Sequence, residues 1–248
     1  MEKPSSEFEG ILLIDKDSGC TSHDVVDKVR RCLKMRSVGH AGTLDPLATG
    51  LLVILVGRAT KVSQYLMSLD KVYEGEFELG KETNSHDRDG DVVAELPVPE
   101  ALDEDSLRKQ MAGFIGDQYQ TPPMFSAKKV NGVALYKLAR QGQEIPREPR
   151  FIHISSFDLL SFDKPKAKFR LSCSKGTYVR TVCNDLGKRI GCGAYMTSLR
   201  RISSDKFNVA NAITIEQLSN MNPSAIKKIL IRWRARCQVL RFNAMKSI

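Results

Sequence analysis

The sequence predicts an α+β fold with a largely antiparallel sheet. Segments typical of strands and helices follow one another without a regular βαβ rhythm, which argues against a parallel, doubly wound sheet. No strand pattern is followed by a GxGxxG turn and a helix, which argues against a dinucleotide-binding fold. The chain has 248 residues, 42% of them hydrophobic, and is long enough to bury a substantial core.

In the first 80 residues, short apolar runs predict buried strands over Gly10–Ile14 and Leu51–Val56. Between them, Thr21 or Ser22 can cap a helix that runs to about Met35. Its apolar positions share one helical face: Val25, Val26, Val29, Cys32 and Leu33. We predict another helix over residues 59–68. Alternation over residues 72–79 predicts a strand with one face formed by Tyr73, Gly75, Phe77 and Leu79.

The second part of the chain continues the mixed pattern. Residues 81–91 are polar and predict a loop, and residues 103–111 predict a helix. Asn131-Gly132 indicates a tight hairpin between residues 126–130 and 133–135. A helix over residues 135–141 should stop at Gly142. The remaining patterns predict strands over 152–162 and 167–173 and a helix from Gly176-Thr177 to about Gly191.

The chain has no apolar run of membrane-spanning length, and its first residues do not resemble a signal peptide. We therefore expect a cytoplasmic protein. Six cysteines occur without any CxxC pair, which predicts reduced thiols and no zinc site. The acidic run Asp87–Asp91 does not continue with the glycine and glutamate of a calcium loop, so we interpret it as a solvated loop.

The positive charge is concentrated at one end. The net charge is +9, and no acidic residue follows Glu216, whereas seven basic residues do. A polyanionic partner is one explanation, and a basic surface kept for solubility is the other. Residues 229–239 alternate apolar and mostly basic side chains, which suits either a strand with an arginine face or a basic helix.

The most informative stretch is GHAGTLDPLATG, residues 39–50, with Asp45 as its one carboxylate. Its three glycines permit close approach of a ligand to the backbone. Pro46 disfavours a helical conformation at Asp45. By itself this pattern is compatible with an ordinary Asp-Pro turn or with a catalytic acid placed before a buried strand.

The same stretch resembles the catalytic motif of the TruB-type pseudouridine synthases, which modify the T-loop of tRNA. The resemblance implies that Asp45 is catalytic. It also implies the pseudouridine synthase fold, with a mixed sheet flanked by helices and a central RNA-binding cleft. It extends over about Gly10–Leu218, so we expect a catalytic domain over residues 1–218. Residues 219–248 would then be a short basic tail in place of a full C-terminal RNA-binding domain.

Further motifs carry the resemblance, and each implies a role. Lys16 ends a first motif in which Asp17 replaces the usual proline, and it would support the loop or contact RNA. In KVYEG, Tyr73 would stack on the target base. In SKGTYVRT, Arg180 would pair with the catalytic aspartate and Tyr178 would line the pocket. The remaining implied substrate contacts are Leu199, in the uracil pocket, and His40, near the flipped base.

The implied reaction converts uridine 55 of the tRNA T-loop into pseudouridine after base flipping. It is redox-neutral and requires no cofactor. Asp45 would attack the ribose or base, or abstract a proton, and these routes stay open. We expect a monomer that needs no protein partner. Two alternatives remain: an RNA-binding or RNA-folding module with vestigial catalysis, and an enzyme of this family acting on another RNA.

Overall fold

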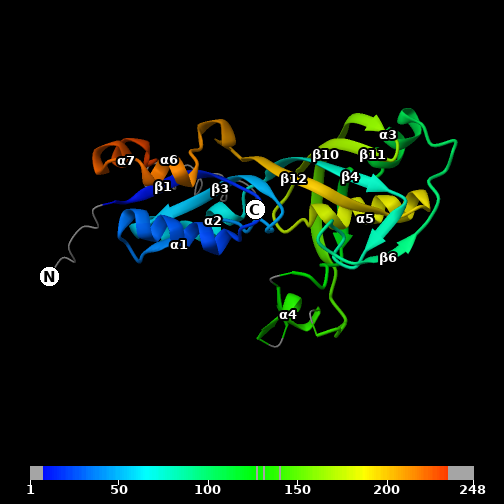
Figure 1. The fold of residues 1–248 in the computed structure, drawn as a ribbon, viewed down its shortest axis with the longest axis horizontal. Helices are drawn as coiled ribbons and strands as arrows, with labels where there is room; N and C mark the ends of the chain where they lie inside the picture. The colour runs from blue at the N-terminus through cyan, green and yellow to red at the C-terminus, as the bar shows by residue number, and fades with distance from the viewer. Residues whose placement is uncertain (1–7, 127, 131, 140, 234–248) are drawn as a thin grey trace. The chain divides into compact units, whose positions relative to one another are not determined.

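The computed structural model describes residues 8–126, 128–130, 132–139 and 141–233, and these form two compact units (Figure 1). Unit 1 contains the described residues up to Lys71 together with those from Arg200 onward. Unit 2 contains residues 72–199. No helix among the described residues is long and apolar enough to cross a membrane.

The sheet of unit 1 is built around β3 (Thr49–Val56). β1 (Gly10–Lys16) pairs with it antiparallel, with Gly10 opposite Val56. β2 (Val38–His40) is also antiparallel to β3. The end of β12 (Ala194–Ser204) pairs with β3 in parallel, and β13 (Phe207–Asn208) then pairs with β12. β3 is an uninterrupted apolar run because both of its faces are covered.

Helices cover both faces of this sheet. On one face, α1 (Ser22–Leu33), α6 (Ile215–Ser219) and α7 (Pro223–Ile229) pack against alternate residues of β1 and β3. Figure 1 shows these three helices running alongside the two strands. On the other face, the core is closed by η1 (Gly57–Val62), α2 (Ser63–Met67), β13 and η2 (Val209–Asn211).

The sheet of unit 2 has the order β12-β4-β11-β10-β7. Its strands are β4 (Lys71–Leu79), β7 (Gly116–Gln120), β10 (Arg150–Asp163) and β11 (Lys166–Cys173), together with the first part of β12. β10 is antiparallel to both β7 and β11. The core contains the tilted ring pair Phe77–Phe169 and the edge-to-face pair Phe157–Phe169. α3 (Glu104–Ala112) packs on β10 and on α5 (Val179–Ile190).

Two small hairpins complete unit 2. One consists of β5 (Lys81–Thr83) and β6 (Val92–Glu95). The other consists of β8 (Lys129–Val130) and β9 (Val133–Ala134). α4 (Leu135–Ala139) follows β9 directly.

The predicted α+β fold with a mixed, mostly antiparallel sheet and flanking helices is confirmed. α1 begins after Thr21, whose side chain and that of Asp24 form a reciprocal capping box. α5 ends at Gly191 with a left-handed φ of 92°. The strand pairing on either side of Asn131-Gly132 is also present.

Several predictions were wrong in part. Residues 59–68 form the end of a 3-10 helix followed by one turn of α-helix. The expected polar loop at 81–91 begins with β5, which pairs with β6. The predicted element at 229–239 begins in α7, and its residues from 234 onward lie outside the described part.

Candidate active site

The loop that carries Asp45 connects β2 to β3 and is held by the N-terminal end of α1. The backbone N–H of Leu44 donates to Ser22 Oγ at 2.8 Å, and this hydroxyl donates to Leu44 O at 3.1 Å. The N–H of Ala48 donates to Asp45 O at 3.1 Å, which closes a turn over Pro46. The turn expected from Asp-Pro is therefore present, and it fixes the backbone of Asp45.

A buried arginine from β12 anchors the same loop. Arg201 is 2% exposed, and its Nε donates to Leu51 O at 2.6 Å. Its Nη atoms donate to Gly42 O at 3.2 Å and Thr43 O at 3.4 Å. The guanidinium of Arg201 is therefore bonded inside unit 1, to backbone carbonyls of the loop and of β3.

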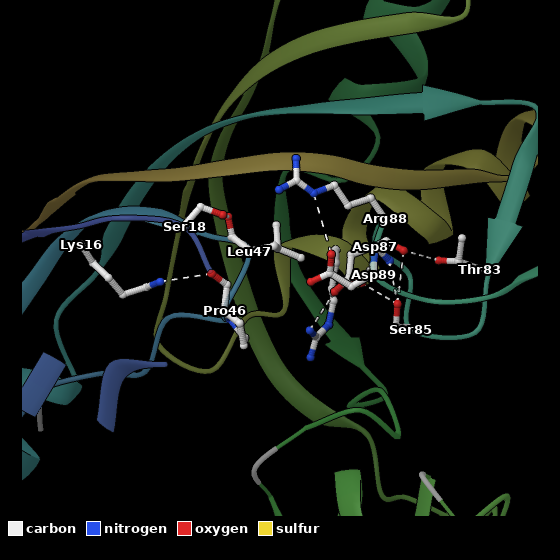
Figure 2. A network of polar contacts seen from close by, with 10 residues as sticks. Lys16, Ser18, Pro46, Leu47, Thr83, Ser85, Asp87, Arg88 and Asp89 are labelled. Carbon is white, nitrogen blue, oxygen red and sulfur yellow. Dashed lines mark hydrogen bonds and ion pairs between the residues drawn. The ribbon is translucent and has the colours of Figure 1, made fainter. Parts of the chain in front are cut away.

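Lys16 supports the loop from β1. It is 1% exposed, and its Nζ donates to Cys20 O at 2.7 Å, Asp17 O at 2.9 Å and Pro46 O at 3.2 Å. Figure 2 shows the bond to Pro46. Ser18 Oγ donates to Leu47 O nearby. Burial lowers the pKa of Lys16, while the negative charge of Asp45 acts in the opposite direction. Of the two roles expected for Lys16, these bonds favour support of the loop, and contact with RNA stays a prediction.

His40 ends β2, five residues before Asp45 and opposite Ile54 of β3. Burial, and then the charge of Arg201, lower its pKa below the usual value. The ring is therefore neutral near pH 7. Its Nδ1 is buried and has no hydrogen-bond partner among the described residues.

The other expected site residues belong to unit 2. Tyr73 lies in β4 and is 8% exposed, and Leu199 lies in β12 and is 7% exposed. Tyr178 is the N-cap residue of α5. The Gln120 amide holds its backbone, because Oε1 accepts from Tyr178 N at 2.8 Å and Nε2 donates to Tyr178 O at 3.1 Å.

Arg180 is the second residue of α5 and is 4% exposed. Its Nη1 donates to Asp87 Oδ2 at 3.1 Å, and Nη2 donates to Phe125 O. The guanidinium also lies 5.8 Å from the centre of the Tyr178 ring. A guanidinium has five N–H donors, so the bond to Asp87 does not by itself exclude a second carboxylate partner. The pairing of Arg180 with Asp45 therefore stays a prediction.

Asp87 is the residue that sequence reasoning missed. We expected a solvated loop, but Asp87 is 3% exposed. Ser85 Oγ and Asp89 N donate to its carboxylate, and Thr83 Oγ1 donates to its backbone O (Figure 2). The signal available in the sequence was Ser85 two residues before this acid, a short polar side chain that can fold back on it.

A cavity of about 590 Å³ lies next to these residues in unit 2. His86, Phe125, Thr181 and Lys188 are among its lining residues. Within the described part of the chain, no cluster of three or more His, Cys, Asp or Glu side chains could hold a metal ion.

Each unit thus brings one set of expected residues together. Lys16, His40 and the Asp45 loop are joined in unit 1, and Tyr178 and Arg180 share the start of α5 in unit 2.

Comparison with solved structures identifies the fold. The chain resembles the crystal structure of a Cbf5-Nop10-Gar1 complex, with a TM-score of 0.68 and 29% identity over 87% of this chain and 55% of that one. It also resembles the archaeal box H/ACA sRNP Nop10-Cbf5 complex, with a TM-score of 0.68 and 25% identity over 91% and 60% of the two chains. The chain therefore spans less than two thirds of either protein.

Comparison with sequences finds one relative of nearly the same length and others that are longer. A tRNA pseudouridine synthase B from Opitutus terrae is 57% identical over 231 residues, covering 93% of this chain and 95% of the relative. The protein of the same name from Syntrophotalea carbinolica is 48% identical over 90% of this chain and 73% of its own length.

The family models define the class as pseudouridylate synthases. The TruB family pseudouridylate synthase N-terminal domain matches residues 30–179, and the tRNA pseudouridylate synthase B C-terminal domain matches residues 180–231. Within that class, the chain belongs to the TruB family.

Proposed function

We propose that this protein is a tRNA pseudouridine synthase that converts the uridine at position 55 of the T-loop into pseudouridine. Membership of the TruB family, together with the names of its close relatives, supports this assignment. The single structural observation that carries it is the Asp45 loop. Buried side chains of α1, β1 and β12 hold the backbone of this loop, which carries the Asp45 carboxylate.

The reaction is an isomerisation. The N1–C1′ bond of uridine breaks, a C5–C1′ bond forms, and the proton on C5 is lost while N1 gains one. Because atoms and electrons balance within the substrate, the chemistry requires no redox group and no donor. The protein must extrude the base from the loop and hold it while it changes its point of attachment.

We assign the roles as follows. Asp45 acts on the ribose or the base, as a nucleophile or by abstracting a proton. Arg180 keeps the Asp45 carboxylate ionised, and Tyr73 stacks on the uracil and helps to transfer the C5 proton. Tyr178 and Leu199 line the uracil pocket, and His40 contacts the RNA beside the flipped base.

The assignment of Asp45 is tested by replacing it. In Asp45→Asn the side chain keeps its shape but loses the charge and the basicity, so pseudouridine formation should fall by at least about 10³-fold. Binding of the tRNA transcript should persist. The measurement is pseudouridine mapping on a tRNA transcript, combined with a binding titration of the same RNA.

Asp70→Asn is the matched control, because Asp70 is an exposed acid of the same unit. It should retain full turnover. Turnover by Asp45→Asn would disprove the role of Asp45. A wild-type protein that binds tRNA tightly but modifies none would favour an RNA-folding module, and modification of a different RNA would redefine the substrate.

A further inference from the structure

A basic hollow of about 430 Å³ lies at the C-terminal end of α1 in unit 1. Its lining residues are Arg30, Arg31, Lys34, Met35 and Arg36. Four of the five carry a positive charge, and Arg31, Lys34 and Arg36 are exposed. This basic hollow is separate from the loop that carries Asp45.

The positive charge of the basic hollow is poorly neutralised. Residues 28–44 contain no carboxylate. Asp27, the nearest preceding acid, pairs with Arg30 Nη1 at 2.9 Å. Among the described residues, Arg31, Lys34 and Arg36 form no ion pair. Because like charges repel, the cluster costs free energy that a bound polyanion would recover.

The helix end explains only part of this charge. Cations in the last turn of a helix are stabilised by its dipole, which accounts for Arg30 and Arg31. Lys34 and Arg36 lie beyond the last turn, where backbone N–H groups of the chain already bond the terminal carbonyl oxygens of α1. The Lys34 N–H donates to Arg30 O and Arg31 O, and the Met35 N–H donates to Arg30 O at 3.0 Å.

The basic hollow is also built to a fixed shape. Lys34 has a left-handed φ of 51°, so the chain turns sharply at the end of α1. Arg30 Nη2 then donates to Val38 O at 2.9 Å, which ties the helix to β2. β2 leads directly to His40. Ordered elements therefore connect the basic hollow to the Asp45 loop.

The distance between the two places follows from α1. The helix binds Leu44 through Ser22 at one end and borders the basic hollow at the other. Its 12 residues span about 18 Å at 1.5 Å per residue. A short RNA stem is long enough to reach both ends.

We propose that the basic hollow binds the phosphodiester backbone of the RNA substrate at a point outside the uridine pocket. The proposal rests on the proposed function, because that function makes RNA the substrate. Arginine forks suit the paired oxygens of a phosphate, and such contacts fix the position of a helix without reading its sequence. The basic hollow would thus set where the stem lies while Asp45 acts on the flipped base.

The test compares identical substitutions inside and outside the basic hollow. Lys34→Gln and Arg36→Gln remove charges that line it, whereas Lys28→Gln removes an exposed charge of α1 that does not. The triple variant Arg31→Gln, Lys34→Gln, Arg36→Gln is the stronger version. Binding of a T-arm hairpin and of full tRNA is titrated at several salt concentrations. All variants in this titration also carry Asp45→Asn, so that the RNA is expected to stay unmodified.

Each single substitution in the basic hollow should raise the Kd about 3–10-fold and lower the salt slope by about 0.7–0.9. The single-turnover rate at saturating RNA, measured with Asp45 intact, should not change. Lys28→Gln should change neither quantity. Thermal melting should be unaltered, since the replaced side chains are exposed.

The two RNAs, hairpin and full tRNA, separate the possible outcomes. Weakened binding of the hairpin assigns the basic hollow to the T-arm backbone, and weakened binding of full tRNA alone assigns it to another arm. If the triple variant binds both RNAs as Lys28→Gln does, the proposal is overturned. Because binding is measured in the Asp45→Asn background, failure of the wild type to form pseudouridine would refute the proposed function and leave this result standing.

Discussion

At the scale of single residues, two buried cations bind carbonyl oxygens of the backbone. Lys16 and Arg201 each donate to three carbonyl oxygens, and each is almost inaccessible. A buried cation is stable only when its donors are satisfied, so these contacts fix the chain around them. The sequence placed Lys16 in a motif, but the burial of Lys16 and Arg201 depends on partners that are distant in the chain.

The pair formed by Asp87 and Arg180 leads to a prediction. Asp87→Asn keeps the size of the side chain but removes the charge beside a buried guanidinium. Breaking a buried ion pair on one side costs about 3–5 kcal/mol, so we expect a loss of that order in the free energy of unfolding. Pseudouridine formation should also fall, because Arg180 loses a partner that orients it.

Urea denaturation and single-turnover assays provide the two measurements. Asp89→Asn is the control, because Asp89 is exposed. A wild-type unfolding curve for Asp87→Asn would show that the ion pair contributes nothing to stability.

His86 gives a prediction about pH. Burial, assisted by the nearby charges of Lys188 and Arg180, lowers its pKa to about 4 from the usual 6.5. Between pH 6.5 and 4 the unfolded chain therefore binds more protons than the folded one, so the free energy of unfolding falls as the pH falls through this window. The shift corresponds to at most about 3 kcal/mol.

His86→Asn removes the titrating ring and suits the left-handed φ of 67° at this position. Denaturation midpoints measured from pH 7 to pH 4 should decline less steeply in this variant than in the wild type. Parallel declines would assign the acid sensitivity to other groups.

At the scale of elements, apolar runs and apolar periodicity located many of the helices and strands. α1, β3, β10 and β11 were predicted from their apolar positions, and α5 was predicted from its start after Gly176-Thr177 and its end near Gly191. β12 was not recognised as a strand. Its sequence is AYMTSLRRISS, and it buries Arg201 and Ser204, which read as surface residues. Such a strand can be recognised only when its partners are known.

The close contact of β4 with its neighbours gives an element-scale prediction. A Cβ on Gly75 would lie 2.6 Å from Ser198 O of β12 and 2.7 Å from Phe169 Cζ of β11. Gly75→Ala should therefore destabilise the fold by about 1–3 kcal/mol, since backbone and ring must move apart. Activity should fall as well, because Tyr73 lies two residues away on the same strand.

Gly39→Ala is the matched control, because its nearest contact would be Thr60 Cγ2 at 3.9 Å. Thermal melting of the two variants makes the comparison. Equal melting temperatures would mean that β4 accommodates a methyl group after a small adjustment.

At the scale of the whole molecule, the boundary of the C-terminal segment matters for experiments. We expected a separate basic tail from residue 219, and that division remains a prediction. The residues up to Trp233 make close contacts in unit 1. Ile226 is buried in its core, Ile231 bridges to Ile11, and Trp233 Nε1 donates to Glu9 Oε1 at 2.8 Å.

Two truncations should therefore behave differently. Removal of residues after Ser219 takes away α7 and its buried Ile226, so unit 1 should lose several kcal/mol of stability. Removal of residues after Trp233 leaves the described core intact but deletes four basic residues. That protein should fold normally, bind tRNA more weakly and show a smaller salt slope.

Thermal melting and RNA titrations at several salt concentrations test both expectations. An unchanged salt slope in the shorter truncation would show that the last 15 residues add no electrostatic affinity. Normal melting after removal of residues beyond Ser219 would show that α7 is dispensable.

The anchoring of the Asp45 loop by Arg201 has a consequence for synthesis of the protein on the ribosome. The loop is made early, but the arginine that binds its carbonyls is made only after the whole of residues 72–199. Unit 2 is continuous in sequence and can fold first, whereas unit 1 must wait for its second segment. We therefore expect a nascent chain to order the Asp45 loop only after residues 72–199 and the start of the second segment of unit 1 have been synthesised.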